Sequence, residues 1–211
     1  LVLRSNFFDT AIMKMSVVSE EFKQRYLSNK DHPLQFKVRA IIFDGPEHYH
    51  KEINNPDLGI DENCILMIRG CGPIGYPGAA EVVNMQPPDH LLKKGITALP
   101  CLGDGRQSGT SESASILNVS PEAAVGGKLS IIENNDIIKV DLINKRVDVL
   151  LKDDVIEERI KNCKFKYAEN QTPWQEISRK YTGQLSDGAC INTVENYFNI
   201  SNTKGIPRDN H

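Results

Sequence analysis

The side chains best suited to chemistry in this sequence lie in a glycine-rich loop. The stretch GDGRQSGTSES at positions 103–113 places Asp104, Arg106, Ser108 and Thr110 among three glycines. Glycine allows tight turns and leaves neighbouring side chains uncovered, so a hydroxyl here can project into a site. The stretch lacks the GxxxxGK[ST] and GxGxxG nucleotide-binding patterns. Two ordinary interpretations stay open: a turn serine, and an Asp104 that pairs with Arg106 or with nearby backbone.

A second glycine-rich loop, RGCGPIGYPGAAEVVNM at positions 69–85, carries the carboxylate of Glu81 just after its glycine-rich turn. An acid near a helix start is commonly a surface residue that complements the helix dipole. Hard divalent cations also prefer carboxylate oxygen, so the alternative interpretation is that Glu81 is a metal ligand. Cys71 lies between two glycines of this loop, and the five cysteines include no CxxC pair. A reducing compartment is therefore more consistent with the sequence than a disulfide framework.

Composition excludes several classes of protein. The 211 residues carry 25 basic and 28 acidic side chains, for a net charge of −3. No basic stretch indicates nucleic-acid or membrane-surface binding, and no apolar run is long enough to cross a bilayer. The first residues, LVLRSNFFDTAIMKMS, do not form a signal peptide. We expect a cytoplasmic protein, with a mitochondrial location as the alternative, and a chain that begins inside a longer one.

The elements that must position the two loops are short. Apolar runs predict strands at 35–43, 64–70 and 96–104, and three β-rich runs within 128–151 predict a meander. Capping and turn residues predict helical segments at 19–28 (capped by Ser19), 45–54 (Pro46 in the first turn), 79–85, 89–95, 120–127 (capped by Ser120), 153–162 (capped by Asp153 or Asp154) and 172–181 (around Trp174). This pattern predicts a mixed α/β domain, a compact sheet or barrel flanked by helices.

Four motifs resemble the C-terminal domain of the dihydroxy-acid/sugar-acid dehydratase family. They are GPIGYPGAAEVVNM, LPCLGDGRQSGTSES, SILNVSPEAAVGG and NDIIKVDLINKRVDVLL, in the family's order and spacing. The tail segments ENQTPWQEISRKYTGQLSDGAC and GIPRDNH, together with GRQSGTS, are similar to the sugar-acid branch, which dehydrates aldonates such as arabinonate and xylonate. The resemblance covers nearly the whole chain, from about residue 12 to residue 211.

The resemblance implies the family's swivelling β/β/α fold and its hydro-lyase chemistry. Ser108 matches the base that takes the C2 proton of the sugar acid, and Thr110 matches a residue that hydrogen-bonds near the substrate. Glu81 matches a Mg²⁺ ligand, and Arg106 is expected to order the loop or bind substrate. The implied cofactors are Mg²⁺ and an iron–sulfur cluster, 2Fe–2S or 4Fe–4S. Neighbouring cations would be needed to make a serine basic.

The resemblance also implies an N-terminal domain that this sequence does not include. The family's cluster cysteines and most of its Mg²⁺ ligands belong to an N-terminal domain, and no cysteine here matches a cluster position. We expect residues 1–163 to form the C-terminal domain, with 1–18 at the junction, and 164–211 to form a tail that packs on it or on a partner subunit. This chain alone would be inactive. The implied assembly is a homodimer or homotetramer.

Two alternatives stay open. One is a dihydroxy-acid dehydratase of branched-chain amino-acid synthesis, against which the GRQSGTS loop and the tail motifs argue. The other is a non-catalytic binding module on the same scaffold. Substrate preference tests the first, and a cluster-bearing upstream domain tests the second.

Overall fold

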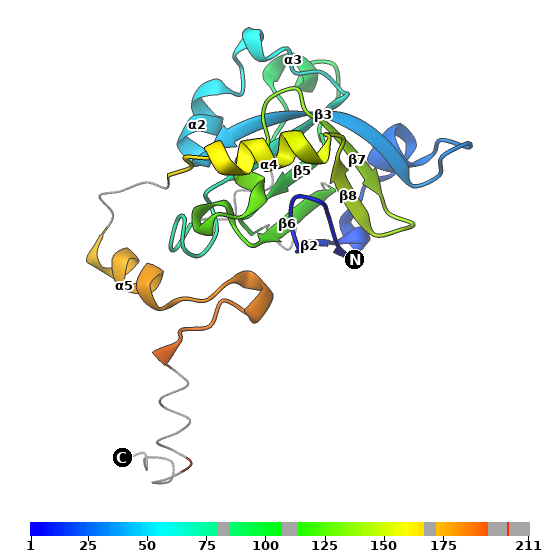
Figure 1. The fold of residues 1–211 in the computed structure, drawn as a ribbon. Helices are drawn as coiled ribbons and strands as arrows, with labels where there is room; N and C mark the ends of the chain where they lie inside the picture. Colours follow the sequence, from blue (N-terminus) through cyan, green and yellow to red (C-terminus); the bar gives the residue numbers. More distant parts are fainter. Residues whose placement is uncertain (80–84, 107–113, 167–171, 194–201, 203–211) are drawn as a thin grey trace, which may run out of the picture.

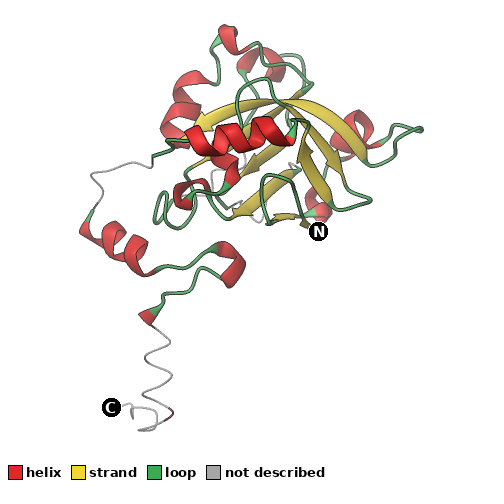
Figure 2. Cartoon of the chain, viewed as in Figure 1, coloured by secondary structure: helices red, strands yellow, loops and turns green. Residues whose placement is uncertain are grey.

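A mixed sheet with helices around it forms the body of the protein (Figures 1 and 2). The computed structural model describes residues 1–79, 85–106, 114–166, 172–193 and 202. Eight strands lie within these residues: β1 Val2–Leu3, β2 Thr10–Met13, β3 Gln35–Asp44, β4 Cys64–Arg69, β5 Cys101–Gly103, β6 Ser115–Ser120, β7 Ile137–Asp141 and β8 Arg146–Val149. The α-helices of the same residues are α1 Glu20–Phe22, α2 Gly45–Glu52, α3 Asp89–Leu92, α4 Asp153–Asn162 and α5 Pro173–Tyr181.

The sheet has the strand order β1-β2-β6-β5-β4-β3-β7-β8. Its four central strands, β6, β5, β4 and β3, run parallel to one another. The pairings outside this group are antiparallel. The two edges of the sheet approach each other where the chain leaves β1. Arg4 donates its N–H to the Lys145 carbonyl (3.0 Å) and accepts from the Val147 N–H (2.9 Å). This nearly closes the sheet and confirms the predicted barrel-like architecture.

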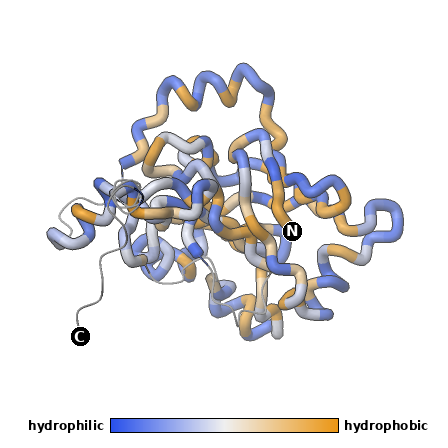
Figure 3. The backbone as a smooth tube through the Cα atoms, turned by 90° about the horizontal axis from the view of Figure 1, so that it is seen from below, coloured by the Kyte–Doolittle hydropathy of each residue, from blue (hydrophilic) through white to orange (hydrophobic). Residues whose placement is uncertain are grey.

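The central strands are buried on both faces, which explains their continuous apolar sequences. Along β3, Ala40 and Ile42 face the larger core inside the barrel, whereas Ile41 and Phe43 face a second core. The second core includes residues that follow α2 and residues of α3. Both helices lie on the same side of β3 (Figure 1). Apolar residues gather in the middle of the molecule, and the loop that protrudes on the right is largely hydrophilic (Figure 3).

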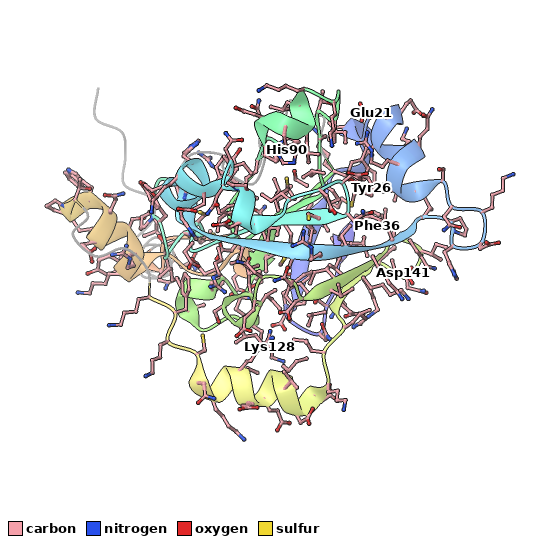
Figure 4. All side chains as sticks on the ribbon, turned by 90° about the horizontal axis from the view of Figure 1, so that it is seen from above. Glu21, Tyr26, Phe36, His90, Lys128 and Asp141 are labelled. Atoms are coloured by element: carbon pink, nitrogen blue, oxygen red, sulfur yellow. The ribbon has the colours of Figure 1, made fainter. Side chains whose placement is uncertain are left out.

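The N-terminal helical segment packs against the start of β3. Ser19 accepts a hydrogen bond from the Phe22 N–H, which confirms it as the cap, and a π-helical turn follows α1 over Lys23–Leu27. The rings of Tyr26 and Phe36 lie 5.4 Å apart where this turn meets β3 (Figure 4). Aromatic contacts of this kind add to the apolar area that each ring buries.

Three predictions about local structure are wrong. The first run of the meander is a 3₁₀ helix, Lys128–Ile131, because Ser130 hydrogen-bonds back to Gly127 and β7 pairs with β3 instead. Ser120 ends β6 and caps no helix; Glu122 precedes the short 3₁₀ helix. Helix α4 starts after Lys152 without a side-chain cap. Its two aspartates occupy the first turn, where they complement the helix dipole.

The other predicted elements divide into confirmed and undescribed ones. The strands at 35–43 and 64–70 and the helices at 45–54, 153–162 and 172–181 are confirmed, and the third predicted strand is confined to β5. The helix expected at 79–85 lies mostly outside the described residues. In the described part of the chain, no helix has the length and apolar character needed to span a membrane.

Candidate active site

The carboxyl ends of the parallel strands meet at one edge of the sheet. In register, Asp44 at the end of β3 lies opposite Arg69 at the end of β4, and Gly103 at the end of β5 lies opposite Ile68. Ligands of sheets with parallel strands commonly bind outside these carboxyl ends. Both loops identified in the sequence leave the sheet here: the loop at 69–85 follows β4, and the loop at 103–113 follows β5.

Asp104 follows β5 directly and is fully buried. Its Oδ1 accepts a hydrogen bond from the Cys71 N–H (2.8 Å), and its Oδ2 accepts from the N–H groups of Gly70 (2.9 Å) and Ala123 (3.0 Å). Burial raises the pKa of Asp104 to about 6, although these three donors favour the ionised form. The carboxylate therefore joins the loops that follow β4 and β6 to the end of β5.

Glu122, two residues after β6, is a second fully buried carboxylate at this edge. It accepts hydrogen bonds from the N–H groups of Gly75 (2.8 Å) and Ile74 (3.1 Å) and from Nε2 of Gln184 (2.9 Å). A side chain at Gly72 would collide with this carboxylate. Glycine is thus required where the loop passes over Glu122. Asp104 holds the loop at Gly70 and Cys71, and Glu122 holds it at Ile74 and Gly75.

A pocket of about 240 Å³ lies between these loops. It is lined by Cys71, Gly72, Pro73, Tyr76, Gly78, Ala79, Asp104, Arg106, Asn118 and Leu185. The Tyr76 hydroxyl donates to Glu47 (3.2 Å), and the negative charge of Glu47 raises the pKa of Tyr76. Drug-sized ligands occupy pockets of roughly 300–1,000 Å³, so this pocket suits a smaller molecule.

A larger pocket of about 650 Å³ lies under the C-terminal end of α4. Its two arginines already have partners: Arg69 binds Asp44 (2.5 Å), and Arg159 binds Asp136 (2.6 Å) and Glu133 (3.0 Å). Of the described residues in the two glycine-rich loops, 69–79, 85 and 103–106, Arg69 alone lines this larger pocket. We therefore place the candidate site in the smaller pocket.

The structure describes one of the four predicted site residues. Arg106 is exposed and lines the smaller pocket. Glu81, Ser108 and Thr110 lie outside the described residues. The alternative that Asp104 pairs with nearby backbone is confirmed by its three N–H donors.

Sequence reasoning missed the role of Glu122, which lies in the helical segment predicted at 120–127. Its only signal was a single acid among small and apolar residues in SPEAAVGG.

The described residues do not by themselves fit a metal ion. Among them, no three His, Cys, Asp or Glu side chains are grouped as metal ligands. The oxygens of Asp104 are engaged by backbone donors, and burial raises the pKa of the Cys71 thiol well above its usual value. A buried thiol of this kind is a poor metal ligand, because the thiolate is the ligating form.

The chain is similar to a group of dehydratases. The family model described as dihydroxy-acid/6-phosphogluconate dehydratase C-terminal matches residues 1–189. A D-xylonate dehydratase of Caulobacter vibrioides is 54% identical over 211 residues, which make up 100% of this chain and 35% of that protein. An L-arabinonate dehydratase of Rhizobium leguminosarum bv. trifolii is 40% identical over 161 residues, 76% of this chain and 26% of that protein.

A relative named for a different substrate is more distant. A dihydroxy-acid dehydratase of Aquifex aeolicus is 33% identical over 161 residues, 75% of this chain and 28% of that protein. The chain therefore spans about a third or less of the length of these relatives.

Proposed function

The chain belongs to the dihydroxy-acid/6-phosphogluconate dehydratase family, and on that premise we propose that it is the C-terminal part of a sugar-acid dehydratase. Its identity to the xylonate and arabinonate dehydratases (54% and 40%) exceeds its identity to the dihydroxy-acid dehydratase (33%). The resemblance to the sugar-acid branch that the motifs predicted is thereby confirmed. The proposed reaction converts an aldonate such as xylonate or arabinonate to its 2-keto-3-deoxy acid.

The observation that carries this proposal is the composition of the smaller pocket. Ala79 and Arg106 line it from two different loops. The residues proposed as Mg²⁺ ligand and base, Glu81 and Ser108, each follow one of these two by two positions in the sequence. Residues close in sequence to Glu81 and to Ser108 thus line the same pocket, which supports a single site that contains both Glu81 and Ser108.

In the proposed reaction, the Ser108 oxygen accepts the proton from C2 of the sugar acid. The C2–H electron pair forms the C2=C3 double bond as the C3 hydroxyl leaves, and the departing oxygen takes up a proton to give water. The resulting enol tautomerises to the 2-keto acid. Thr110 is proposed to hydrogen-bond the substrate, and the Arg106 guanidinium is suited to its carboxylate, since Arg binds carboxylates in a bidentate manner.

The cofactors and partners are part of the same proposal. Mg²⁺ and an iron–sulfur cluster, held largely by an N-terminal domain, would supply Lewis acidity when bound. That domain and a second copy of the protein are the proposed partners. On α5, Trp174 is 79% exposed and Ile177 is 50% exposed, which supports packing of the tail against another part of the assembly. The free cysteines are consistent with the proposed cytoplasmic location.

The proposal is tested with two variants of the full-length protein. We expect Ser108→Ala to abolish dehydration of the aldonate while iron, sulfide and Mg²⁺ contents stay at the wild-type level. Arg106→Ala should raise the KM for the aldonate, because it removes a contact to the substrate carboxylate. Near-normal turnover by Ser108→Ala would remove Ser108 from the reaction. A full-length protein without iron and sulfide would favour the non-catalytic binding module.

A further inference from the structure

The C-terminal segment 172–186 contacts the glycine loop that forms one wall of the candidate site. Gln175 Nε2 donates to the Pro77 carbonyl (3.0 Å), and Arg179 Nε donates to the Ile74 carbonyl (2.7 Å). Gln175 also accepts a hydrogen bond from the Thr172 N–H (2.9 Å), which caps α5. Gln175, the third residue of the helix and part of its capping box, therefore also attaches the helix to the loop. Figure 1 shows α5 at the lower left, below the sheet.

The same segment reaches the loop a second time through Glu122. The side-chain amide of Gln184 makes two hydrogen bonds to this residue: Oε1 accepts from the Glu122 N–H (3.0 Å), and Nε2 donates to Glu122 Oε1 (2.9 Å). Glu122 in turn accepts from the N–H groups of Ile74 and Gly75. The N–H and the carbonyl of Ile74 are thus both held by groups that the segment provides or orients.

Burial of apolar side chains does not account for this attachment. Helix α5 has no buried residue, and its large apolar side chains Trp174 and Ile177 are exposed. The Arg179 side chain, in contrast, is only 8% exposed, so its bond to the loop carbonyl is shielded from water. Shielded hydrogen bonds to charged groups are stronger than exposed ones. The position of the segment is therefore specified by its polar contacts to the loop.

We infer that segment 172–186 is a positioning element for the active-site loop, and that Arg179 and Gln184 are the positioning residues through which it acts. This inference rests on the proposed function, because the loop matters to turnover only if it forms the site. Neither residue needs to contact the substrate. Arg179 holds the Ile74 carbonyl, and Gln184 orients Glu122, which binds the N–H groups of Ile74 and Gly75. This backbone leads to the pocket lining at Tyr76 and Gly78.

The test combines amide hydrogen exchange with kinetics on the full-length protein. In Gln184→Ala, the loss of both bonds to Glu122 should speed exchange at Ile74 and Gly75 about tenfold. The kcat for the aldonate should fall about tenfold or more while its KM changes little, because a displaced loop misplaces reacting groups. Lys180→Ala is the matched control: Lys180 is exposed on α5 and contacts the Tyr181 ring. It should leave both readouts unchanged.

A reciprocal exchange of the two side chains tests the pair itself. Gln184→Glu places a second carboxylate beside Glu122, so loop exchange should be faster than in Gln184→Ala. Adding Glu122→Gln reverses the donor and acceptor of the pair and should restore slower exchange and part of the lost kcat. Failure of the double variant to recover either readout would overturn the pairing.

Two further outcomes separate this inference from the proposed function. If Gln184→Ala leaves loop exchange or kcat unchanged, the segment is not a positioning element. If the wild-type holoenzyme turns over no aldonate, the proposed function fails, whatever the exchange data show.

Discussion

The replacement Asp104→Asn tests whether burial raises the pKa of Asp104, the buried acid at the candidate site. Burial raises the pKa of Asp104 from its usual 3.8 to about 6, so the folded loop holds a proton more tightly than the opened loop does. The folded state therefore binds more protons between these two values, and the stability of the loop falls as pH rises through them. Asparagine does not titrate in this range, so the variant lacks this dependence.

The expected size follows from the two pKa values. With about 3.8 in the opened loop and about 6 in the folded one, linkage predicts a change of about thirtyfold in the opening equilibrium between roughly pH 4.5 and 7.5. This corresponds to about 2 kcal/mol. The effect of other titrating groups cancels when wild type and variant are compared at each pH.

The assay is amide hydrogen exchange of the full-length protein, read at Gly70 and Cys71, whose N–H groups bind Asp104. After correction for intrinsic exchange, the ratio of wild-type to Asp104→Asn protection should fall about thirtyfold as pH rises across this range. A flat ratio would contradict the raised pKa. A ratio that rises with pH would mean that the three N–H donors outweigh burial.

Three further changes test the loop, a β-hairpin and the core. Gly75→Ala would place Cβ 2.8 Å from the Gly70 carbonyl oxygen, so it should lower the free energy of unfolding by about 1–3 kcal/mol and slow turnover. The Asn144 N–H lowers the pKa of Asp141. Asp141→Asn should therefore weaken protection of the Asn144 amide at neutral pH. This difference should persist down to pH 3.8, the usual pKa of an aspartate, and shrink only below it, because the lowered pKa keeps the wild-type carboxylate ionised to lower pH. Met67→Ala removes a side chain that is 1% exposed and should cost about 2–5 kcal/mol in urea denaturation, whereas an unchanged midpoint would contradict the burial.

The sequence predicts the strands and helices that are specified by residues within the element itself, such as apolar runs, helix caps and a proline in the first helical turn. The apolar runs of β3 and β4 predict strands because both of their faces are buried. Helix starts are readable where a cap lies in the sequence itself, as with Ser19 and Thr172, whose side chains accept from backbone N–H groups three residues later. Pro46 occupies the first turn of α2 for the same local reason, since it needs no hydrogen-bond partner there.

Long-range pairing decides what the sequence does not reveal. Glu122 lies in a turn by local criteria, yet its partners Ile74 and Gly75 are 48 and 47 residues away and Gln184 is 62 residues away. No spacing rule connects these positions. The run after Lys128 has strand-forming residues, but β3 is already paired with β7 and β4 on its two sides. The family motifs, by contrast, pointed to both loops that line the pocket.

The most direct test of the central claim is substrate turnover by the full-length protein. Xylonate, arabinonate and 2,3-dihydroxyisovalerate are supplied separately, and 2-keto acid formation is measured with iron, sulfide and Mg²⁺ contents known. We predict a kcat/KM for one of the two aldonates well above that for 2,3-dihydroxyisovalerate. A preference for 2,3-dihydroxyisovalerate, or no turnover of any of the three by the fully loaded protein, would contradict the assignment to sugar-acid dehydration.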